Sequence, residues 1–197
     1  MHEIGRIKQV QVQCSSLKVG LRPHRYYDPT PLLVVSRLLL MPGGVVGITT
    51  EGEQVMDVHN ADHSDTRNSN GDNGISIGFT GHYHVMRKHF GAHLIDGIAG
   101  ENILVEAEEE QSASDFERGI VIKRLDNGRL IHLTRVVVAA PCIEFSQFAI
   151  NAQTPPSNQL IKETLQFLND GRRGFYATLP ELNELAVVQS GDILFAL

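Results

Sequence analysis

The sequence lacks a surplus of positive charge, and this absence narrows the range of partners. Its 197 residues contain 17 Lys and Arg against 23 Asp and Glu, a formal net charge of −6 at pH 7. Proteins that bind nucleic acids or anionic membranes use a basic field to neutralise the phosphates. We therefore expect neither nucleic acid nor a membrane as the main partner.

Long apolar runs are also missing. The longest, from Pro31 to Met41, is interrupted by Ser36 and Arg37 and is shorter than the roughly 20 residues that cross a bilayer. The N-terminal segment MHEIGRIKQV contains no charged region followed by an apolar run, as a signal peptide would. These absences predict a protein without a transmembrane helix and with a cytoplasmic location.

Only two cysteines are present, Cys14 and Cys142, too few for a scaffold of disulfides. In a reducing compartment we expect both to be free thiols. Cys14 follows a segment in which Val10 and Val12 alternate with the glutamines at positions 9, 11 and 13. This period of two predicts a strand whose valines and Cys14 face the core and whose glutamines face water.

Cys142 has a different setting, at the end of the segment VVVAAPC. The proline before it makes the chain leave a predicted strand, at a point where a side chain can point into a cleft. A thiol in a cleft is a suitable metal ligand. The alternative is a buried thiol that packs as a small hydrophobic side chain, and this segment alone does not decide between the two.

The composition is typical of a folded, strand-rich protein. Hydrophobic residues make up 42% and charged residues 20%, and the length predicts a single domain over residues 1–197. The 18 glycines and 8 prolines are scattered between short apolar segments, a pattern typical of a mainly β fold with many turns. The predicted strands are 9–14, Leu32–Met41, Val45–Thr50, Ile103–Glu106, Gly119–Leu125, Leu130–Ala139, Gly174–Thr178, Leu185–Gln189 and Asp192–Ala196.

Two segments have the spacing of helices instead. In Phe79–Phe90, the side chains of Tyr83 and Met86 recur at helical intervals with the final phenylalanine, which predicts a short amphipathic helix. A second helix is predicted to begin after Ser157, which is an acceptable N-cap, and to carry an apolar stripe through Leu168.

Three further segments are predicted to be turns or loops. The tripeptide Asp126-Asn127-Gly128 predicts a hairpin with a type I′ turn, because Asn-Gly readily takes the two positive φ angles that this turn needs. The polar segment 60–73 predicts a long loop, which in a compact domain is often functional. The acidic run 106–110 predicts an exposed loop.

Histidines cluster in one part of the chain, since six of the nine lie between positions 59 and 93. Two pairs, His59/His63 and His89/His93, have the spacing that places both imidazoles on one face of a helix, as many zinc sites require. This pattern suggests a zinc-dependent hydrolase. Histidines that are exposed or hydrogen-bonded, with no metal, are the alternative.

Four more motifs follow one another along the chain. They are GENILVE at 100–106, APC at 140–142, RRGFYA at 172–177 and SGDILFAL at 190–197. Together they resemble the MOSC domain, a family named for the C-terminal part of molybdenum cofactor sulfurases, clearly over 81–197 and more loosely from Gly5. The resemblance implies a mainly β fold: a MOSC-type β-barrel with a few peripheral helices, as a single MOSC-like domain over residues 1–197.

The resemblance also implies a site. By motif match, Cys142 ligates the molybdenum of the molybdenum cofactor (molybdopterin) or carries a persulfide sulfur, and both roles suit a soft thiolate. Glu101 and Asn102 are expected to shape the pocket wall beside it, as supports rather than catalysts. Pyridoxal phosphate belongs to a separate desulfurase domain of the fused sulfurases and is not expected on this chain.

The phosphate of such a cofactor is expected to need cationic partners. Many relatives carry an arginine just before the Pro-Cys, where this chain has alanines at 139 and 140. Arg67, Arg135 or Arg173 would have to take that role. The candidate cofactor-binding residues are therefore Arg67 and Arg173, together with Glu101 and Asn102.

Three functions follow from these interpretations. The first is an oxidoreductase that binds molybdenum cofactor through Cys142 and reduces small N-hydroxylated or N-oxide compounds, with electrons from an external flavin or iron–sulfur protein. The second is a sulfur carrier in which Cys142 holds a persulfide received from a cysteine desulfurase. The third is the histidine-dependent zinc hydrolase. The sequence names neither the substrate nor the electron donor, and it does not fix the oligomeric state.

Overall fold

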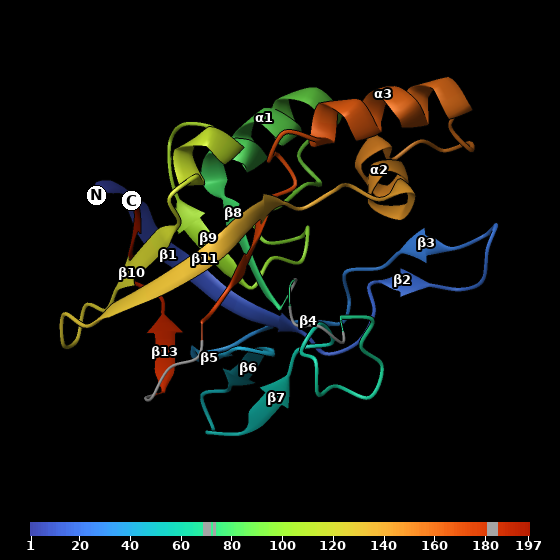
Figure 1. The fold of residues 1–197 in the computed structure, drawn as a ribbon. Helices are drawn as coiled ribbons and strands as arrows, with labels where there is room; N and C mark the ends of the chain where they lie inside the picture. The colour runs from blue at the N-terminus through green and yellow to red at the C-terminus, as the bar shows by residue number, and fades with distance from the viewer. Residues whose placement is uncertain (69–71, 73, 181–184) are drawn as a thin grey trace.

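A closed barrel of seven strands forms the centre of the fold (Figure 1). The structure is a computed structural model that describes residues 1–68, 72, 74–180 and 185–197. Around the ring the order is β14-β10-β11-β12-β8-β9-β1, and β1 closes it by pairing with β14. The strands are β1 (His2–Gln13), β8 (Ile75–Phe79), β9 (Ile103–Glu106), β10 (Ile120–Lys123), β11 (Leu130–Val138), β12 (Phe175–Thr178) and β14 (Ile193–Ala196). The expected mainly β barrel is thus confirmed.

Neighbouring strands of the ring are antiparallel except β8 and β9, which run parallel. Parallel neighbours need a crossover, and α1 (Thr80–Phe90) lies in the segment that joins them. The barrel interior is filled by aliphatic and aromatic side chains that are almost wholly shielded from solvent, among them Ile77, Ile122, Leu133 and Phe175.

A smaller sheet lies below the barrel, in the order β13-β5-β6-β7 (Figure 1). Its strands are β5 (Arg37–Met41), β6 (Gly44–Ile48), β7 (Gln54–Met56) and β13 (Ala186–Gln189). The predicted strand over 32–41 is therefore two strands, because β4 (Leu32–Val34) pairs with β1 and the chain then bends at Ser36. There the Ser36 backbone N–H and hydroxyl both donate to the carbonyl of Ile48. A two-stranded hairpin of β2 (Lys18–Val19) and β3 (Tyr26–Tyr27) projects beside the barrel.

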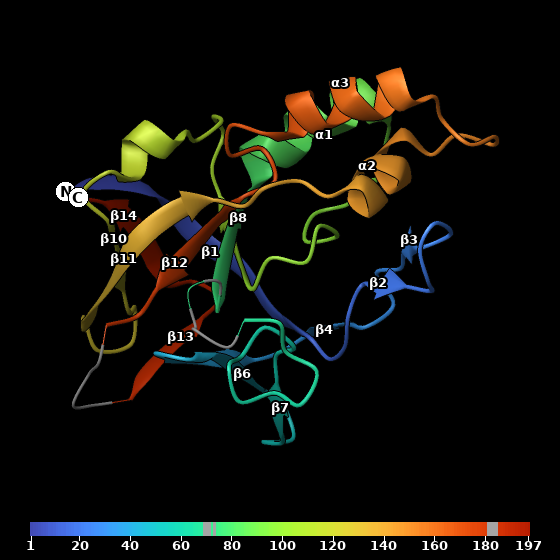
Figure 2. The same cartoon turned by 45° about the vertical axis from the view of Figure 1, so that its right-hand side comes forward.

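The helices gather on one side of the barrel rim (Figures 1 and 2). They are α1, α2 (Ile143–Ile150) and α3 (Asn158–Leu168). A second apolar cluster fills the space beneath them and includes Tyr83, Met86, Phe145 and Leu168. Both helices predicted from periodicity are present, and the predicted Ser157 cap accepts a hydrogen bond from the N–H of Leu160 at 3.2 Å. Helix α2 was not predicted from the apolar spacing of the sequence.

The predicted orientation of two glutamines in β1 is wrong. Gln11 and Gln13 are 4% and 7% exposed, because a loop covers the outer face of the strand while the core covers its inner face. The amide of Gln11 donates to the carbonyls of Gly97 (2.7 Å) and Glu101 (2.9 Å). The amide of Gln13 donates to Gly100 at 2.6 Å. These side chains replace water with backbone acceptors, so they fasten β1 to the loop before β9.

The prediction that Cys14 faces the core is also wrong, because Cys14 is exposed. Strand β1 ends at Gln13, so the alternation that governs Val10 and Val12 no longer applies to the next residue. The backbone N–H of Cys14 donates to the carbonyl of Pro31, which draws the chain toward β4.

The predicted turns lie where expected, but the turn over 126–128 has a different type from the one predicted. The 126–128 segment does join the antiparallel pair β10 and β11, but the Arg124 N–H donates to the Arg129 carbonyl across four residues. Only Gly128 has a positive φ there, +71°, so the turn is not type I′. Residues 60–68 form turns and bends, as expected, whereas 69–71 and 73 of that predicted loop lie outside the described residues. Within the described ranges, no helix has the length and apolar character to cross a membrane.

Candidate functional site

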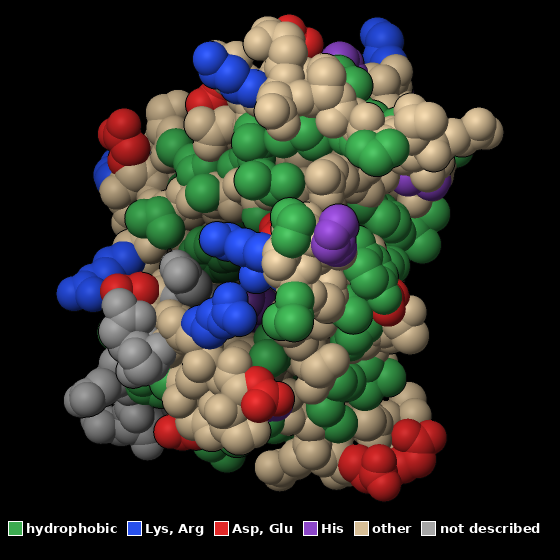
Figure 3. All heavy atoms as spheres, turned by 90° about the vertical axis from the view of Figure 1, so that its right-hand side faces the viewer, with side chains coloured by type: hydrophobic (Ala, Val, Ile, Leu, Met, Phe, Trp, Pro, Cys, Tyr) green, Lys and Arg blue, Asp and Glu red, His purple; other side chains and the backbone are tan. Residues whose placement is uncertain are grey.

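A cleft of about 580 Å³ opens between the barrel rim and the β2–β3 hairpin. Figure 3 views this side of the molecule, where Lys and Arg side chains gather beside a hollow. The cleft brings together three of the predicted site residues, Cys142, Arg67 and Arg173. Its lining residues are Gln13, Ser15, Ser16, Leu17, Lys18, Tyr27, Val58, His59, Asp65, Arg67, Ala140, Cys142, Arg173 and Tyr176.

Cys142 is placed by the start of α2. It is the N-cap residue of that helix, with an extended backbone, and its sulfur accepts a hydrogen bond from the N–H of Phe145 at 3.4 Å. The hydroxyl of Ser146 donates to the Cys142 carbonyl at 2.9 Å and secures the same turn. Cys142 is half-buried, so its thiol sits in the cleft wall with the first turn of α2 behind it.

Arg173 forms the wall beside Cys142. It follows α3 and stands just before the start of β12. Its guanidinium donates to the carbonyl of Ala99 and lies 4.8 Å from the ring centroid of Phe145, a cation–π contact. Both contacts fix the direction of the side chain, so the cleft has a cation that is held in place.

Glu101 lies behind Arg173 and does not line the cleft. Its side chain is 2% exposed and accepts a hydrogen bond from the Tyr83 hydroxyl at 2.9 Å. Burial raises the pKa of Glu101 above its ordinary value, and the positive charge of Arg173 only partly opposes this. Its Oε1 atom has no hydrogen-bond partner among the described residues, and Gly78 leaves the space for it, since a Cβ there would lie 2.6 Å away.

Two more cations line the cleft. Arg67 comes from the loop after β7, and Lys18 comes from β2; both are exposed. Arg135, the other arginine considered for a phosphate, is not among the lining residues and pairs with Asp72 at 3.5 Å. Lys18, Arg67 and Arg173 thus concentrate positive charge in one cleft of a protein whose net charge is −6.

An aspartate and a histidine that the sequence analysis did not pair also meet at the cleft: His59 is a lining residue, and Asp57 is buried beside it. The carboxylate of Asp57 is fully buried and accepts from the Nδ1 atom of His59 at 3.1 Å, and from the backbone N–H of the same histidine at 2.8 Å. The spacing Asp-x-His was the available clue, because an aspartate often bonds to the backbone two residues on.

Asn102 is a further hydrogen-bond partner of Asp57. Its amide nitrogen donates to Asp57 Oδ2 at 2.8 Å, and its oxygen accepts from the backbone N–H and the hydroxyl of Ser76, at 3.0 and 2.8 Å. Asn102 is 2% exposed and does not line the cleft. The structure therefore places neither Glu101 nor Asn102 in the cleft lining: Glu101 interacts electrostatically with the lining residue Arg173, and Asn102 donates to Asp57, the partner of the lining residue His59.

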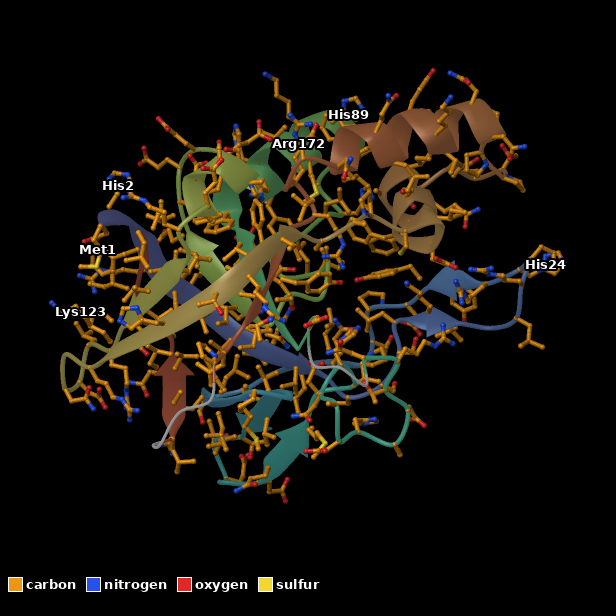
Figure 4. All side chains as sticks on the ribbon, in the orientation of Figure 1. Met1, His2, His24, His89, Lys123 and Arg172 are labelled. Carbon is orange, nitrogen blue, oxygen red and sulfur yellow. The ribbon has the colours of Figure 1, made fainter. Side chains whose placement is uncertain are left out.

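The two histidine pairs do not form zinc sites in the part of the chain that is described. His59 and His63 lie in turns rather than on a helix, and α1 ends at Phe90, before His93. His89 stacks on Phe167, with ring centroids 4.1 Å apart, at the end of α1 far from the hairpin tip (Figure 4). No group of three or more His, Cys, Asp or Glu among residues 1–68, 72, 74–180 and 185–197 could hold a metal.

Comparison with known proteins identifies the fold. No family model and no curated protein matches the chain. The structure is similar to that of the YuaD protein from Bacillus subtilis, with a TM-score of 0.57, 15% identity, and coverage of 96% of this chain and 93% of that one. A structure described only as a hypothetical protein has a TM-score of 0.53 and 13% identity, and the match covers 98% of this chain and 68% of that one. YiiM from Escherichia coli has a TM-score of 0.48 and 13% identity, with coverage of 100% of this chain and 70% of that one. The chain therefore shares its fold with the YuaD protein, at a sequence identity that leaves activity open.

Proposed function

We propose that this protein binds molybdenum cofactor in the Cys142 cleft and reduces small N-hydroxylated or N-oxide compounds. The observation that carries the proposal is the meeting of a half-buried thiol and three cationic side chains in one cleft. The MOSC resemblance of the motifs around Glu101, Cys142 and Arg173 supports it, because the fold brings these distant motifs to one place.

The residues of the cleft fit such a cofactor. A thiolate is a soft ligand suited to a redox-active metal, and Cys142 presents its sulfur at the cleft wall. The anionic phosphate of the cofactor would be held by Arg173, Arg67 and Lys18, of which Arg173 has a fixed direction. A volume of about 580 Å³ lies within the range of small-molecule and cofactor sites, which is roughly 300–1,000 Å³.

The reaction would cleave an N–O bond. When bound, molybdenum would supply the capacity to take up the oxygen atom and pass electrons to it. A hydroxylamine would be converted to an amine and water, which consumes two electrons and two protons; the electrons would come from an external flavin or iron–sulfur protein. The residues of this chain would bind the cofactor, orient the substrate and deliver protons.

A reductase assay tests this proposal. Protein would be purified from a host that makes molybdenum cofactor and assayed with an N-hydroxylated base and an amidoxime, with reduced viologen as artificial electron donor. We expect turnover by the wild type, none by Cys142→Ser, and unchanged turnover by Cys14→Ser, a matched control because Cys14 is a free thiol outside the cleft. Equal activity in all three proteins, or in none, would contradict the proposal.

A sulfur carrier is the second candidate, and the accessibility of Cys142 favours it. The thiol is half-exposed in an open cleft, so a cysteine desulfurase could transfer sulfur to it. Incubation with a desulfurase and cysteine, followed by assay of cyanide-reactive sulfur, distinguishes the two functions. Transferable sulfur on the wild type but not on Cys142→Ser, in protein without molybdenum, would replace the reductase proposal with the carrier.

A further inference from the structure

We infer that His59, oriented by the buried Asp57, is the proton donor to substrate in the Cys142 cleft. This inference rests on the proposed function and adds a residue to it, since the N–O cleavage consumes protons. The sequence spacing pairs His59 with His63, whereas the structure pairs it with Asp57.

The carboxylate of Asp57 is held in a fixed position by hydrogen bonds. It is fully buried and accepts hydrogen bonds from the backbone N–H of Gln13 (2.7 Å) and the side chain of Asn102 (2.8 Å) on Oδ2, and from His59 on Oδ1. Because these donors come from β1, from the residue just before β9 and from the loop itself, the barrel fixes the position of the carboxylate. Buried carboxylates are stable as ions only when they are bonded in this way.

The geometry leaves one ring nitrogen of His59 for the cleft. Nδ1 is bound to Asp57, while Nε2 has no hydrogen-bond partner among the described residues. The His59 side chain is 37% exposed and lines the same cleft as Cys142. A histidine held by a carboxylate through Nδ1, with Nε2 toward the substrate, is the arrangement used for proton transfer in many enzymes.

The charges around the ring are consistent with this role. The cleft also contains the cations Lys18, Arg67 and Arg173 and the carboxylate of Asp65. The buried carboxylate of Asp57 contacts the ring directly, at Nδ1.

The reaction consumes two protons, and we assign the transfer of one of them to His59. In R–NHOH + 2 e⁻ + 2 H⁺ → R–NH₂ + H₂O, the N–O bond breaks, the nitrogen is reduced, and the external flavin or iron–sulfur protein is oxidised. The Nε2–H of the His59 imidazolium donates one proton to the departing oxygen, which leaves as water. Solvent supplies the proton that appears on the amine and later reprotonates His59.

The first test compares His59→Gln with the matched variant His24→Gln. His24 is an exposed histidine at the tip of the β2–β3 hairpin, away from the cleft lining (Figure 4). We expect His59→Gln to keep its molybdenum and its melting temperature and to lose about 10²-fold or more in kcat, the usual effect of general acid–base catalysis. Added imidazole should restore part of that loss, and His24→Gln should match the wild type.

The second test does not depend on activity. In metal-free protein labelled with ¹⁵N-histidine, NMR should show neutral His59 protonated on Nδ1, and Asp57→Asn should abolish that preference. A His59 protonated on Nε2 in the wild type would overturn the inference whatever the metal content.

The outcomes separate the two claims. An active, molybdenum-containing wild type with unchanged kcat in His59→Gln overturns the role of His59 and leaves the proposed function standing. A wild type without molybdenum and without activity overturns the proposed function and, with it, the reductive step assigned to His59. Loss of kcat that imidazole does not restore, with lowered molybdenum in His59→Gln, assigns the histidine to cofactor binding and also overturns the inference.

Discussion

The barrel interior and the cleft at its rim differ in the chemistry of their side chains and in the parts of the fold that supply them. The interior packs side chains such as Ile77, Ile122 and Phe175 from neighbouring strands, and each is shielded from solvent. The cleft collects polar side chains from the ends of elements: Cys142 at the start of α2 and Arg173 before β12. A regular framework thus fixes residues that are irregularly placed in sequence, and changes to the two regions should have separable effects.

The largest expected effect is on the interior. Phe175→Ala would remove a fully buried ring that contacts Phe116 and Phe79, with centroid distances of 5.1 and 6.1 Å. A cavity of this kind costs about 3–5 kcal/mol of unfolding free energy. Urea unfolding would measure it, and a loss below about 1 kcal/mol would show that the interior can collapse around the site.

A substitution at the junction of the two regions comes next. Gly174 has φ +97°, and a Cβ there would lie 2.5 Å from the carbonyl oxygen of Ile77. We expect Gly174→Val to lose on the order of 3 kcal/mol, from strain and the displaced strand. Gly128→Val is the matched control, since Gly128 also has a positive φ but nothing within 4 Å. Equal losses in both would show that backbone strain, rather than the contact with β8, sets the cost.

Asn102→Ala probes the support of the cleft. It removes one of the donors to the buried Asp57 and the acceptor for the backbone N–H and hydroxyl of Ser76. The expected loss is about 1–3 kcal/mol. The same variant should weaken the Nδ1 preference of His59 in NMR spectra. If it alters neither stability nor that spectrum, Asn102 does not position Asp57.

The smallest expected effect is a change in pH dependence at Glu101. Burial raises its pKa in the folded protein, so above its ordinary value of 4.5 the unfolded chain releases this proton before the folded chain does. Ionisation of this carboxyl therefore lowers the free energy of unfolding as pH rises from about 4.5 to the raised pKa. Glu101→Gln should remove that loss, as measured by urea unfolding between pH 4 and 8 relative to wild type. A parallel pH dependence in both proteins would contradict the shift.

The local parts of the fold were predictable from the sequence. Helices α1 and α3 follow from apolar spacing, and the Ser157 cap follows from a side chain that bonds within its own turn. The β10–β11 hairpin was correctly located for the same reason. Such features depend on contacts between residues that are close in sequence.

The errors arose where distant segments decide the environment. Gln11 and Gln13 alternate like exposed residues, yet the loop before β9 covers them, which only the folded chain reveals. The alternation predicts a core position for Cys14, because the pattern does not reveal that β1 ends at Gln13. Lys18 of the cleft could not be identified, because nothing in its neighbourhood in sequence connects it with Cys142.

The molybdenum content of three purified proteins tests the central claim most directly. Plasma mass spectrometry would be applied to wild type, Cys142→Ser and Cys14→Ser, each purified without metal stripping from a host that makes molybdenum cofactor. We predict near-stoichiometric molybdenum in the wild type and in Cys14→Ser, and its loss in Cys142→Ser. Wild-type protein without molybdenum, or Cys142→Ser with as much as the wild type, would contradict the assignment of the cleft.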